Sequence, residues 1–159
     1  MAHELLIGLS PTEVAQVLSL GSRMTVPSGA SLFRLGDPAE CLFLTESGRI
    51  RLTLPMQVRG REEDVLIEEK LPGQTVGWSA LIPPYRFTLT ATAALETEVI
   101  ALSREALRSY FESEPSAGYK IGLNLAIVVG RRLQLVQAMW LREVQRTVEL
   151  RSARPGDAG

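Results

Sequence analysis

Cysteine and histidine are almost absent from this sequence: Cys41 and His3 are the only ones among 159 residues. One cysteine excludes a disulfide within the chain, and one distant histidine cannot complete a structural zinc site. His3 also provides no well-placed base for a Ser-His-Asp triad, and no carboxylates pair in a recognisable catalytic arrangement. We therefore expect a protein that is not an enzyme and binds no metal. We expect Cys41 to be a buried structural thiol and His3 to lie in a loosely ordered N-terminus.

Strong net charge and long apolar runs are also missing. The formal net charge is −1, which gives no overall attraction to nucleic acid or to an anionic membrane. No stretch approaches the roughly 18 apolar residues of a membrane span. Residues 1–9 lack the basic start and apolar run of a signal peptide. The cytoplasm is therefore the expected location, and neither nucleic acid nor membrane is an expected partner.

The composition is that of a globular domain, with 45% hydrophobic and 22% charged residues. Glycine and proline turn signals recur from about residue 24 onward and separate short β-type runs. Ile50, Leu52 and Leu54 alternate with polar residues, as in a half-buried strand. The runs are 31–34, 41–45, 49–56, 65–71, 87–92 and 99–102, and we interpret the charged segment 58–64 as a solvated hairpin loop. Short, regularly spaced strands predict a sandwich or barrel.

Helices are expected at both ends of this β region. Ser10 is a helix-capping residue, followed by Pro11 at the first helical position and by Glu13 in the first turn. Ser103 caps a second short helix. A long helix is expected from about residue 116 to 150. Thirty-five residues would extend roughly 50 Å, whereas a compact domain of the preceding residues is only about 35 Å across.

The long helix should therefore project beyond its own domain, yet apolar residues continue along it. The simplest surface to cover them is the same helix of a second copy. We predict a homodimer whose interface contains Leu125, Val129, Leu133, Val136, Trp140 and Val144. The alternative is a helix that folds back after Gly130 as two shorter ones.

Five stretches, in order along the chain, resemble the cyclic-nucleotide-binding domain of catabolite-activator-type regulators, kinase regulatory subunits and gated channels. They are 9–13, 29–39, 42–52, 71–77 and 97–107, and the resemblance extends over about residues 9–140. It implies a mainly β fold: a double-stranded β-helix, or jelly-roll-like β-roll, with an N-terminal helix and a long C-terminal helix. The domains are then a β-roll at 1–115, a dimerisation helix at 116–150 and a disordered tail at 151–159. Too few residues follow Leu150 for the helix-turn-helix of the transcription regulators in this family.

The segment 77–92 matches the phosphate-binding cassette of this family. In the family, a short helix N-terminus and an arginine hold the cyclic phosphate, and a glutamate holds the ribose hydroxyl. Gly77, Ala80 and Leu81 match, and Arg86 falls at or next to the arginine position. Trp78 occupies the glutamate position, and the loss of a hydrogen bond to a charged acceptor costs about 1.5–3 kcal/mol.

The resemblance therefore implies a sensor module with an altered cassette that binds a small anion, either a cyclic nucleotide or another, and signals through its dimer. The prolines at 83 and 84 stiffen the loop and remove two N–H donors. Trp78, Tyr85 and Arg86 form an aromatic anion pocket in this hypothesis. The predicted ligand-binding residues are Gly77, Trp78, Ser79, Ala80, Tyr85, Arg86, Phe87 and Thr88.

Two alternatives remain open. In the first, Trp78 and Tyr85 fill the pocket, and the protein is a ligand-free scaffold that acts through its long helix. In the second, the arginines of that helix recruit an unidentified protein partner or nucleic acid. Each of these residues also has an explanation that involves no ligand. Trp78 packs in the core, and Arg86 is a surface arginine or the partner of an ion pair.

Overall fold

A computed structural model describes residues 2–153 of the chain. Two four-stranded antiparallel sheets form a β-roll, with strand orders β1-β8-β3-β6 and β2-β7-β4-β5. The strands are β1 (Ser22–Val26), β2 (Ser31–Phe33), β3 (Cys41–Ser47), β4 (Ile50–Val58), β5 (Arg61–Lys70), β6 (Thr75–Val76), β7 (Thr90–Ala93) and β8 (Thr97–Ser103). The 3₁₀-helices are η1 (Glu4–Leu6) and η2 (Trp78–Leu81), and the α-helices are α1 (Pro11–Ser19), α2 (Arg104–Ser113) and α3 (Pro115–Ser152). The predicted mainly β architecture with flanking helices is confirmed.

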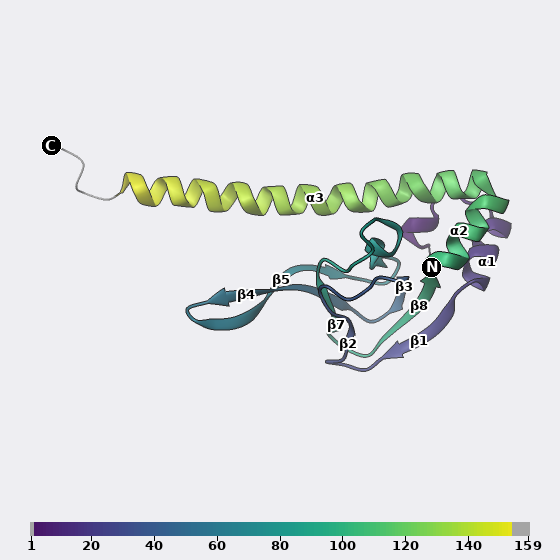
Figure 1. Ribbon diagram of the computed structural model, residues 1–159, viewed down its shortest axis with the longest axis horizontal. Helices are drawn as coiled ribbons and strands as arrows, with labels where there is room; N and C mark the ends of the chain where they lie inside the picture. The colour runs from purple at the N-terminus through teal and green to yellow at the C-terminus, as the bar shows by residue number, and fades with distance from the viewer. Residues whose placement is uncertain (1, 154–159) are drawn as a thin grey trace.

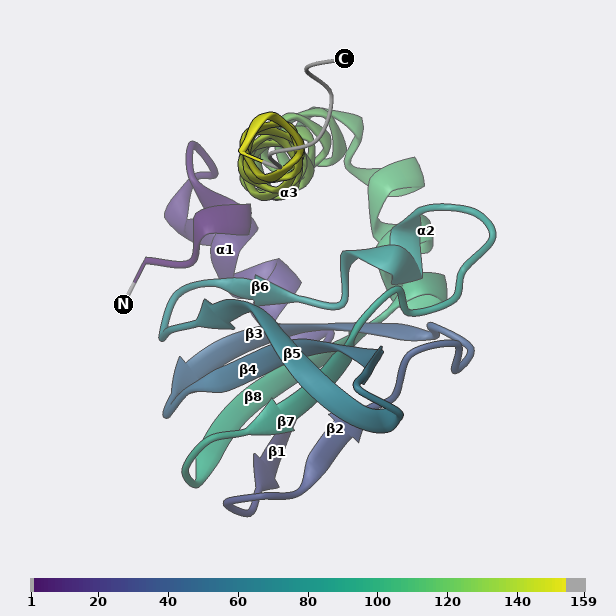
Figure 2. The same ribbon diagram turned by 90° about the vertical axis from the view of Figure 1, so that its left-hand side faces the viewer.

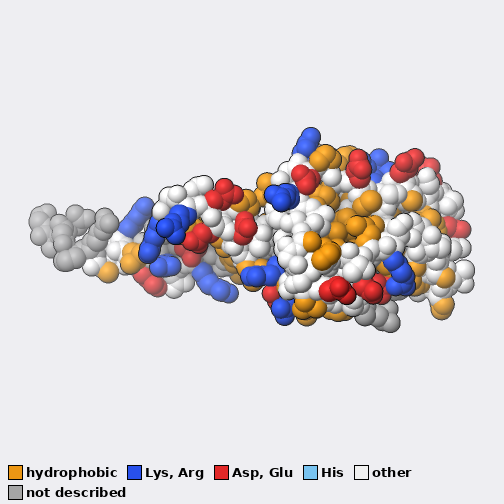
Figure 3. Space-filling view, turned by 90° about the horizontal axis from the view of Figure 1, so that it is seen from below, with side chains coloured by type: hydrophobic (Ala, Val, Ile, Leu, Met, Phe, Trp, Pro, Cys, Tyr) orange, Lys and Arg blue, Asp and Glu red, His pale blue; other side chains and the backbone are white. Residues whose placement is uncertain are grey.

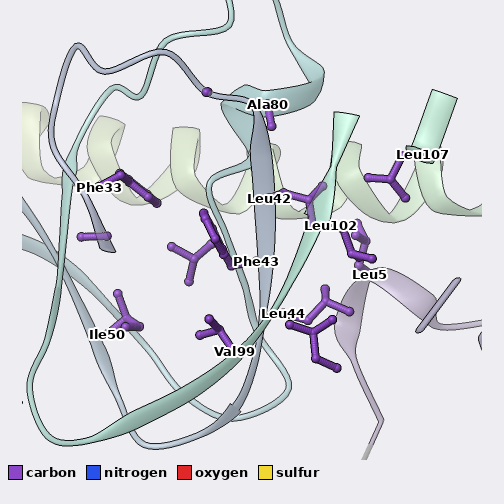
Figure 4. Packing of buried hydrophobic residues seen from close by; sticks show 14 of the residues in the cluster. Leu5, Phe33, Leu42, Phe43, Leu44, Ile50, Ala80, Val99, Leu102 and Leu107 are labelled. Carbon is purple, nitrogen blue, oxygen red and sulfur yellow. The ribbon is translucent and has the colours of Figure 1, made fainter. Parts of the chain in front are cut away.

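The core has two layers because strand β3 is covered on both faces. Phe43 points between the sheets, with Phe33, Ile50 and Val99, as Figure 4 shows. The alternate residues Leu42 and Leu44 point outward. They pack against a second group on the helical side, made of Leu5, Leu102 and Leu107. The helices α1, α2 and α3 lie together above this sheet (Figure 2).

The expected helix starts agree with the structure. Ser10 and Glu13 form a complete capping box, in which each side chain bonds the backbone N–H of the other residue. The Ser103 hydroxyl accepts a hydrogen bond from the N–H of Ala106 at the start of α2. Both caps satisfy N–H groups that have no partner within the helix. The sequence reasoning was therefore correct where a local hydrogen bond determines the boundary.

Several local predictions differ from the structure. The segment 58–64 is mostly strand, and only Arg59 and Gly60 form the turn, with φ of 51° and 78°. Positive φ at both positions is the geometry of a tight two-residue hairpin, so the ladder continues to the turn. His3 is 5% exposed rather than loosely ordered, and its Nε2 lies 3.5 Å from Glu46. Cys41 is only half-buried.

Helix α3 is continuous through Gly130, and its 38 residues correspond to about 57 Å. Its buried residues are Ala117, Ile121 and Val128, all in the first half. The second half projects past the roll in the same direction as the β4–β5 hairpin (Figure 1). The helix includes Arg151 and Ser152, which the sequence reasoning had placed in a disordered tail. The rest of that predicted tail, 154–159, lies outside the described residues.

Large hydrophobic side chains remain exposed on the projecting half of α3. They are Leu133, Leu135, Val136, Trp140, Leu141, Val144, Val148 and Leu150, with exposed fractions between 37% and 63%. Figure 3 shows the narrow extension that leaves the broad body, with hydrophobic and charged side chains intermixed. Within residues 2–153, no helix combines the length and apolarity needed to cross a membrane.

We predict that Gly48→Ala lowers the free energy of unfolding by about 3–4 kcal/mol. Gly48 has φ of +86°, and an added Cβ would lie 2.6 Å from the carbonyl oxygen of Glu96. Both the backbone conformation and the neighbouring strand would have to change. Urea denaturation measures the loss. Gly60→Ala is the matched control, because Gly60 also has positive φ but an added Cβ there has no neighbour within 4 Å. An equal loss in both variants would contradict the prediction.

Candidate functional site

The candidate site is the segment between β6 and β7. Gly77 has φ of +80° and is the N-cap residue that precedes the 3₁₀-helix η2. An added Cβ on Gly77 would lie 3.0 Å from the ring of Phe87 and 3.3 Å from the ring of Phe33. Only glycine therefore fits this position, both because of its backbone angle and because of the rings beside it. The cassette backbone packs directly on an aromatic cluster inside the roll.

That cluster fills the interior of the roll beneath the cassette. The rings of Phe33 and Phe87 are stacked, with centroids 3.6 Å apart and planes 7° from parallel. Phe43 lies 6.0 Å from Phe33. The cavity that remains has a volume of about 10 Å³ and is lined by Phe33, Leu52, Gly77, Trp78, Ser79, Phe87, Thr88, Leu89 and Arg132. This is about the space of one water molecule, whereas pockets for small organic ligands usually span about 300–1,000 Å³.

Trp78 lies between the roll and helix α3. It is half-buried, and the guanidinium carbon of Arg132 lies 5.9 Å from the centre of its ring. It lines the small cavity on one side, and on the other side it lines a wider groove against α3. The indole that replaces the expected carboxylate is therefore a wall between two spaces.

Arg86 does not lie with Trp78. Its side chain is exposed, and its Nη1 donates a hydrogen bond of 2.9 Å to the carbonyl of Gly36. The backbone of Arg86 pairs with Pro38 in an isolated bridge. The arginine thus joins two loops at the surface, and it lines neither the small cavity nor the wider groove.

Tyr85 also points away from Trp78, toward helix α2. The guanidinium carbon of Arg104 lies 4.1 Å from the centre of its ring, and Arg108 donates a hydrogen bond to its hydroxyl. Arg104 also donates to the carbonyls of Ala39 and Ala80, at 2.7 and 3.2 Å. Two arginines of α2 therefore hold the cassette loop from outside. The structure therefore does not bring Trp78, Tyr85 and Arg86 together in the pocket predicted from the sequence.

The other predicted ligand-binding residues are divided between interior and surface. Ser79 and Ala80 are buried in η2, where the N–H of Ala80 bonds the carbonyl of Gly77. Phe87 is buried in the aromatic cluster, and Thr88 is exposed beside Trp78. Among the predicted interface residues, Leu125 packs against the chain's own core. Val129 is half-buried, and the remaining four are exposed.

A largely buried group of charges joins the roll to α3 next to Trp78. Glu68 of β5 accepts a hydrogen bond of 2.6 Å from Nε of Arg132 and lies 2.9 Å from Nζ of Lys70. Lys70 is 4% exposed. Burial alone raises the pKa of Glu68, but the hydrogen bonds and charges of Lys70 and Arg132 outweigh it, so the pKa is lowered. Glu68 is therefore held as a carboxylate between two cations.

Sequence reasoning missed Phe33, Glu68 and Arg132 as parts of this site. Phe33 and Phe87 are 54 positions apart, and Glu68 and Arg132 are 64 apart, so no local pattern connects them. One signal was present in the helix: Arg132 lies four residues after the buried Val128, on the same face. An arginine on a buried helical face indicates a buried acidic partner.

Comparison with known proteins gives a consistent result. The profile of the cyclic nucleotide-binding domain matches residues 23–114. The chain is 32% identical over 127 residues to the cyclic AMP receptor protein of Thermus thermophilus, which covers 80% of this chain and 56% of that protein. The crystal structure of Thermus thermophilus catabolite activator protein superposes with a TM-score of 0.69 at 30% identity, covering 94% of this chain and 63% of that one.

Glutaminase 1 of Bradyrhizobium diazoefficiens is also 32% identical, over 138 residues. This match covers 84% of the chain but only 21% of the glutaminase, so the similarity does not indicate glutaminase activity in this chain. The chain thus spans about half the length of the cyclic AMP receptor protein and a fifth of the glutaminase.

Proposed function

The chain belongs to the cyclic nucleotide-binding domain family, and from that premise we propose a non-enzymatic regulatory module whose inner nucleotide site is closed. The observation that carries this proposal is the stacked pair Phe33–Phe87, with Trp78 beside it, where the cavity that these residues line has a volume of only about 10 Å³. The outward position of Arg86 supports it further, because the cation expected at the cyclic phosphate bonds Gly36 instead. The printed name of the Thermus relative refers to cyclic AMP, but this interior favours a different input.

We expect no binding of cyclic AMP, cyclic GMP or cyclic dinucleotides by isothermal titration calorimetry at concentrations up to about 1 mM. A ribose and phosphate would have to displace two stacked phenylalanine rings that pack against Gly77. Trp78→Glu is the informative variant, since it restores the carboxylate of the family pattern but leaves both rings in place. We expect that this variant binds no cyclic nucleotide either. Micromolar affinity for a cyclic nucleotide in the wild type would overturn the proposal.

We further propose that the module acts as a homodimer through α3. Val129, Leu133, Val136, Trp140 and Val144 follow one another at spacings of three or four residues, the periodicity of a helix–helix seam. The same stripe continues toward the N-terminus of α3 through Ala126 and Gly122, both exposed. An added Cβ on Gly122 would meet no other atom within 4 Å, so a second helix has room to approach closely. Leu125 is omitted from this seam because it packs on the core.

The proposed module also acts on a protein partner that is not identified. The match to a fifth of a glutaminase supports a module of this fold working beside an enzyme. A cytoplasmic location stays a prediction from the sequence.

A further inference from the structure

Helix α3 carries a second row of exposed apolar side chains, on the face turned away from the roll. We call it the outer stripe, and its members are Tyr119, Leu123, Ile127, Leu141 and Val148, between 49% and 69% exposed. Since an α-helix turns about 100° per residue, these five lie within an arc of about 80°. The arc is roughly opposite the buried Ile121 and Val128. Figure 1 shows the sheets on one side of α3 only.

The outer stripe is separate from the proposed homodimer seam. The seam through Leu133, Val136 and Trp140 points about 100° away from the outer stripe around the helix axis. Gly130 lies within the outer stripe, and an added Cβ there would meet no other atom within 4 Å. The backbone of a further helix therefore has room to approach the outer stripe while the seam is occupied.

The seam and the outer stripe together form a face without a charged side chain. Every charged residue of α3 between positions 119 and 148 lies on the other half of the helix: Lys120, Arg131, Arg132, Arg142, Glu143 and Arg146. A helix pair buries two or three of every seven positions, an arc of about 100–150°. The uncharged face of α3 covers about 180° over about eight turns. A homodimer would therefore leave the outer stripe in water.

Symmetry argues against a further copy of this chain as the occupant of the outer stripe. When two α3 helices pair in parallel, the two-fold axis runs between them, and the two outer stripes point to opposite sides of the dimer. Contact between the outer stripes of two dimers would leave one stripe exposed at each end, so the assembly would not close. One separate helix for each chain covers both stripes in a closed complex.

The edge of the outer stripe that lies away from the seam is basic. Arg131 and Arg142 are about three turns apart on this edge. The side chain of Arg131 is 66% exposed and lies 3.7 Å from Glu4, and Arg142 is exposed. The acidic Glu149 follows on the same edge only beyond Leu141. A helix docked on residues 119–141 would therefore be complemented by acidic side chains along this edge.

We propose that the outer stripe binds an amphipathic α-helix of another protein, with one apolar face and one acidic edge. The apolar face would pack on Tyr119, Leu123 and Ile127, and the acidic edge would lie beside Arg131 and Arg142. Amphipathic helices bind apolar surfaces through side chains spaced three or four residues apart. The inference rests on the proposed function, because it names the class of protein partner on which the module acts.

The probe is a fluorescein-labelled peptide of about 21 residues, as long as the helical segment 119–141. It has leucine at heptad positions a and d, glutamate at e and g, and alanine elsewhere. We expect one saturable site per chain by fluorescence anisotropy, with a Kd on the order of 10 µM. The same peptide with lysine for glutamate should bind about tenfold more weakly, because Arg131 and Arg142 would repel it. Equal affinity for both peptides would overturn the acidic edge.

Ile127→Glu locates the site, because Ile127 is 52% exposed and a carboxylate there would face the apolar side of the peptide. We expect the glutamate peptide to bind at least about tenfold more weakly, and Leu123→Glu should give the same result. Leu150→Glu is the matched control, since Leu150 is 61% exposed and lies about 180° from Leu141 around the helix. An unchanged Kd in Ile127→Glu, in protein that melts as the wild type does, would refute the site.

Further outcomes separate this inference from the proposed dimer. If the wild type sediments as two chains and binds no peptide, the outer stripe fails as a docking site and the dimer stands. If the wild type is monomeric but Ile127→Glu abolishes peptide binding, the docking site stands and the dimer fails. If the peptide dissociates the dimer, it occupies the seam, and a separate outer stripe is wrong. Binding to phosphatidylglycerol vesicles without binding to the peptide would assign the stripe to a lipid surface and refute the helix.

Discussion

Replacement of Glu68 by alanine is expected to lower the free energy of unfolding by about 3–5 kcal/mol. The variant would leave Lys70, 4% exposed, and the largely buried Arg132 without their shared carboxylate. Removal of one member of a buried ion pair costs this much because the remaining charge stays desolvated. Chemical denaturation at one fixed protein concentration measures the change, since self-association would otherwise contribute to it.

Glu69→Ala is the matched control, one residue along the same strand. Glu69 lies 3.7 and 3.9 Å from Arg49 and Arg51, whose side chains are 43% and 50% exposed. Exposed ion pairs of this kind contribute about 1 kcal/mol or less. If the two alanine variants lose equal stability, the Glu68 group does not hold α3 to the roll.

The same group predicts a pH dependence with a definite sign. The pKa of Glu68 is lowered in the folded protein from its ordinary value of 4.5. A carboxyl group with a lowered folded pKa contributes stability that is present above its ordinary pKa and is lost as the pH falls through the folded value. The difference in unfolding free energy between the wild type and Glu68→Gln should therefore be constant above about pH 6 and shrink below pH 4.5. A difference that grows on acidification would refute the assignment.

The sequence predicts this fold well where the determining interactions are local or periodic. Ser10 and Ser103 indicate two helix starts by their capping chemistry, and the alternation in Ile50, Leu52 and Leu54 indicates a half-buried strand. The long helix follows from its uninterrupted pattern. Strand β1 was missed because four of its five residues are exposed, so it lacks the alternation of a half-buried strand. Pairing with β8 forms it instead.

The cassette shows where sequence reasoning ends. The sequence shows which residues occupy the cassette positions, but the directions of the Trp78, Tyr85 and Arg86 side chains depend on distant residues. Arg86 bonds Gly36, 50 positions away, and Tyr85 is held by Arg104 and Arg108 of α2. The filled interior depends on Phe33, at the end of β2, stacking on Phe87 in the loop before β7. Contacts of this kind are determined by the tertiary fold, and a single sequence does not specify them.

The prediction with the largest expected effect on assembly concerns the projecting half of α3. We expect the wild type to sediment as two chains and the variant Leu133→Glu/Trp140→Glu to sediment as one, with the dissociation constant of the dimer raised by at least about a hundredfold. These side chains are 57% and 63% exposed in the single chain. Two-fold symmetry would bring four carboxylates into one seam, where like charges oppose each other without a cation to pair them.

Leu135→Glu is the matched control for this variant. Leu135 is 37% exposed on the same helix, but two residues correspond to a rotation of about 200°, which places it on the face opposite Leu133. A charge there should leave the dimer intact. Sedimentation velocity over a concentration series distinguishes the outcomes, and the emission of Trp140 should shift to shorter wavelength as the seam forms. A wild-type chain that remains monomeric at about 100 µM would refute the dimer, and the exposed stripe from Leu133 to Val144 would then require another protein to cover it.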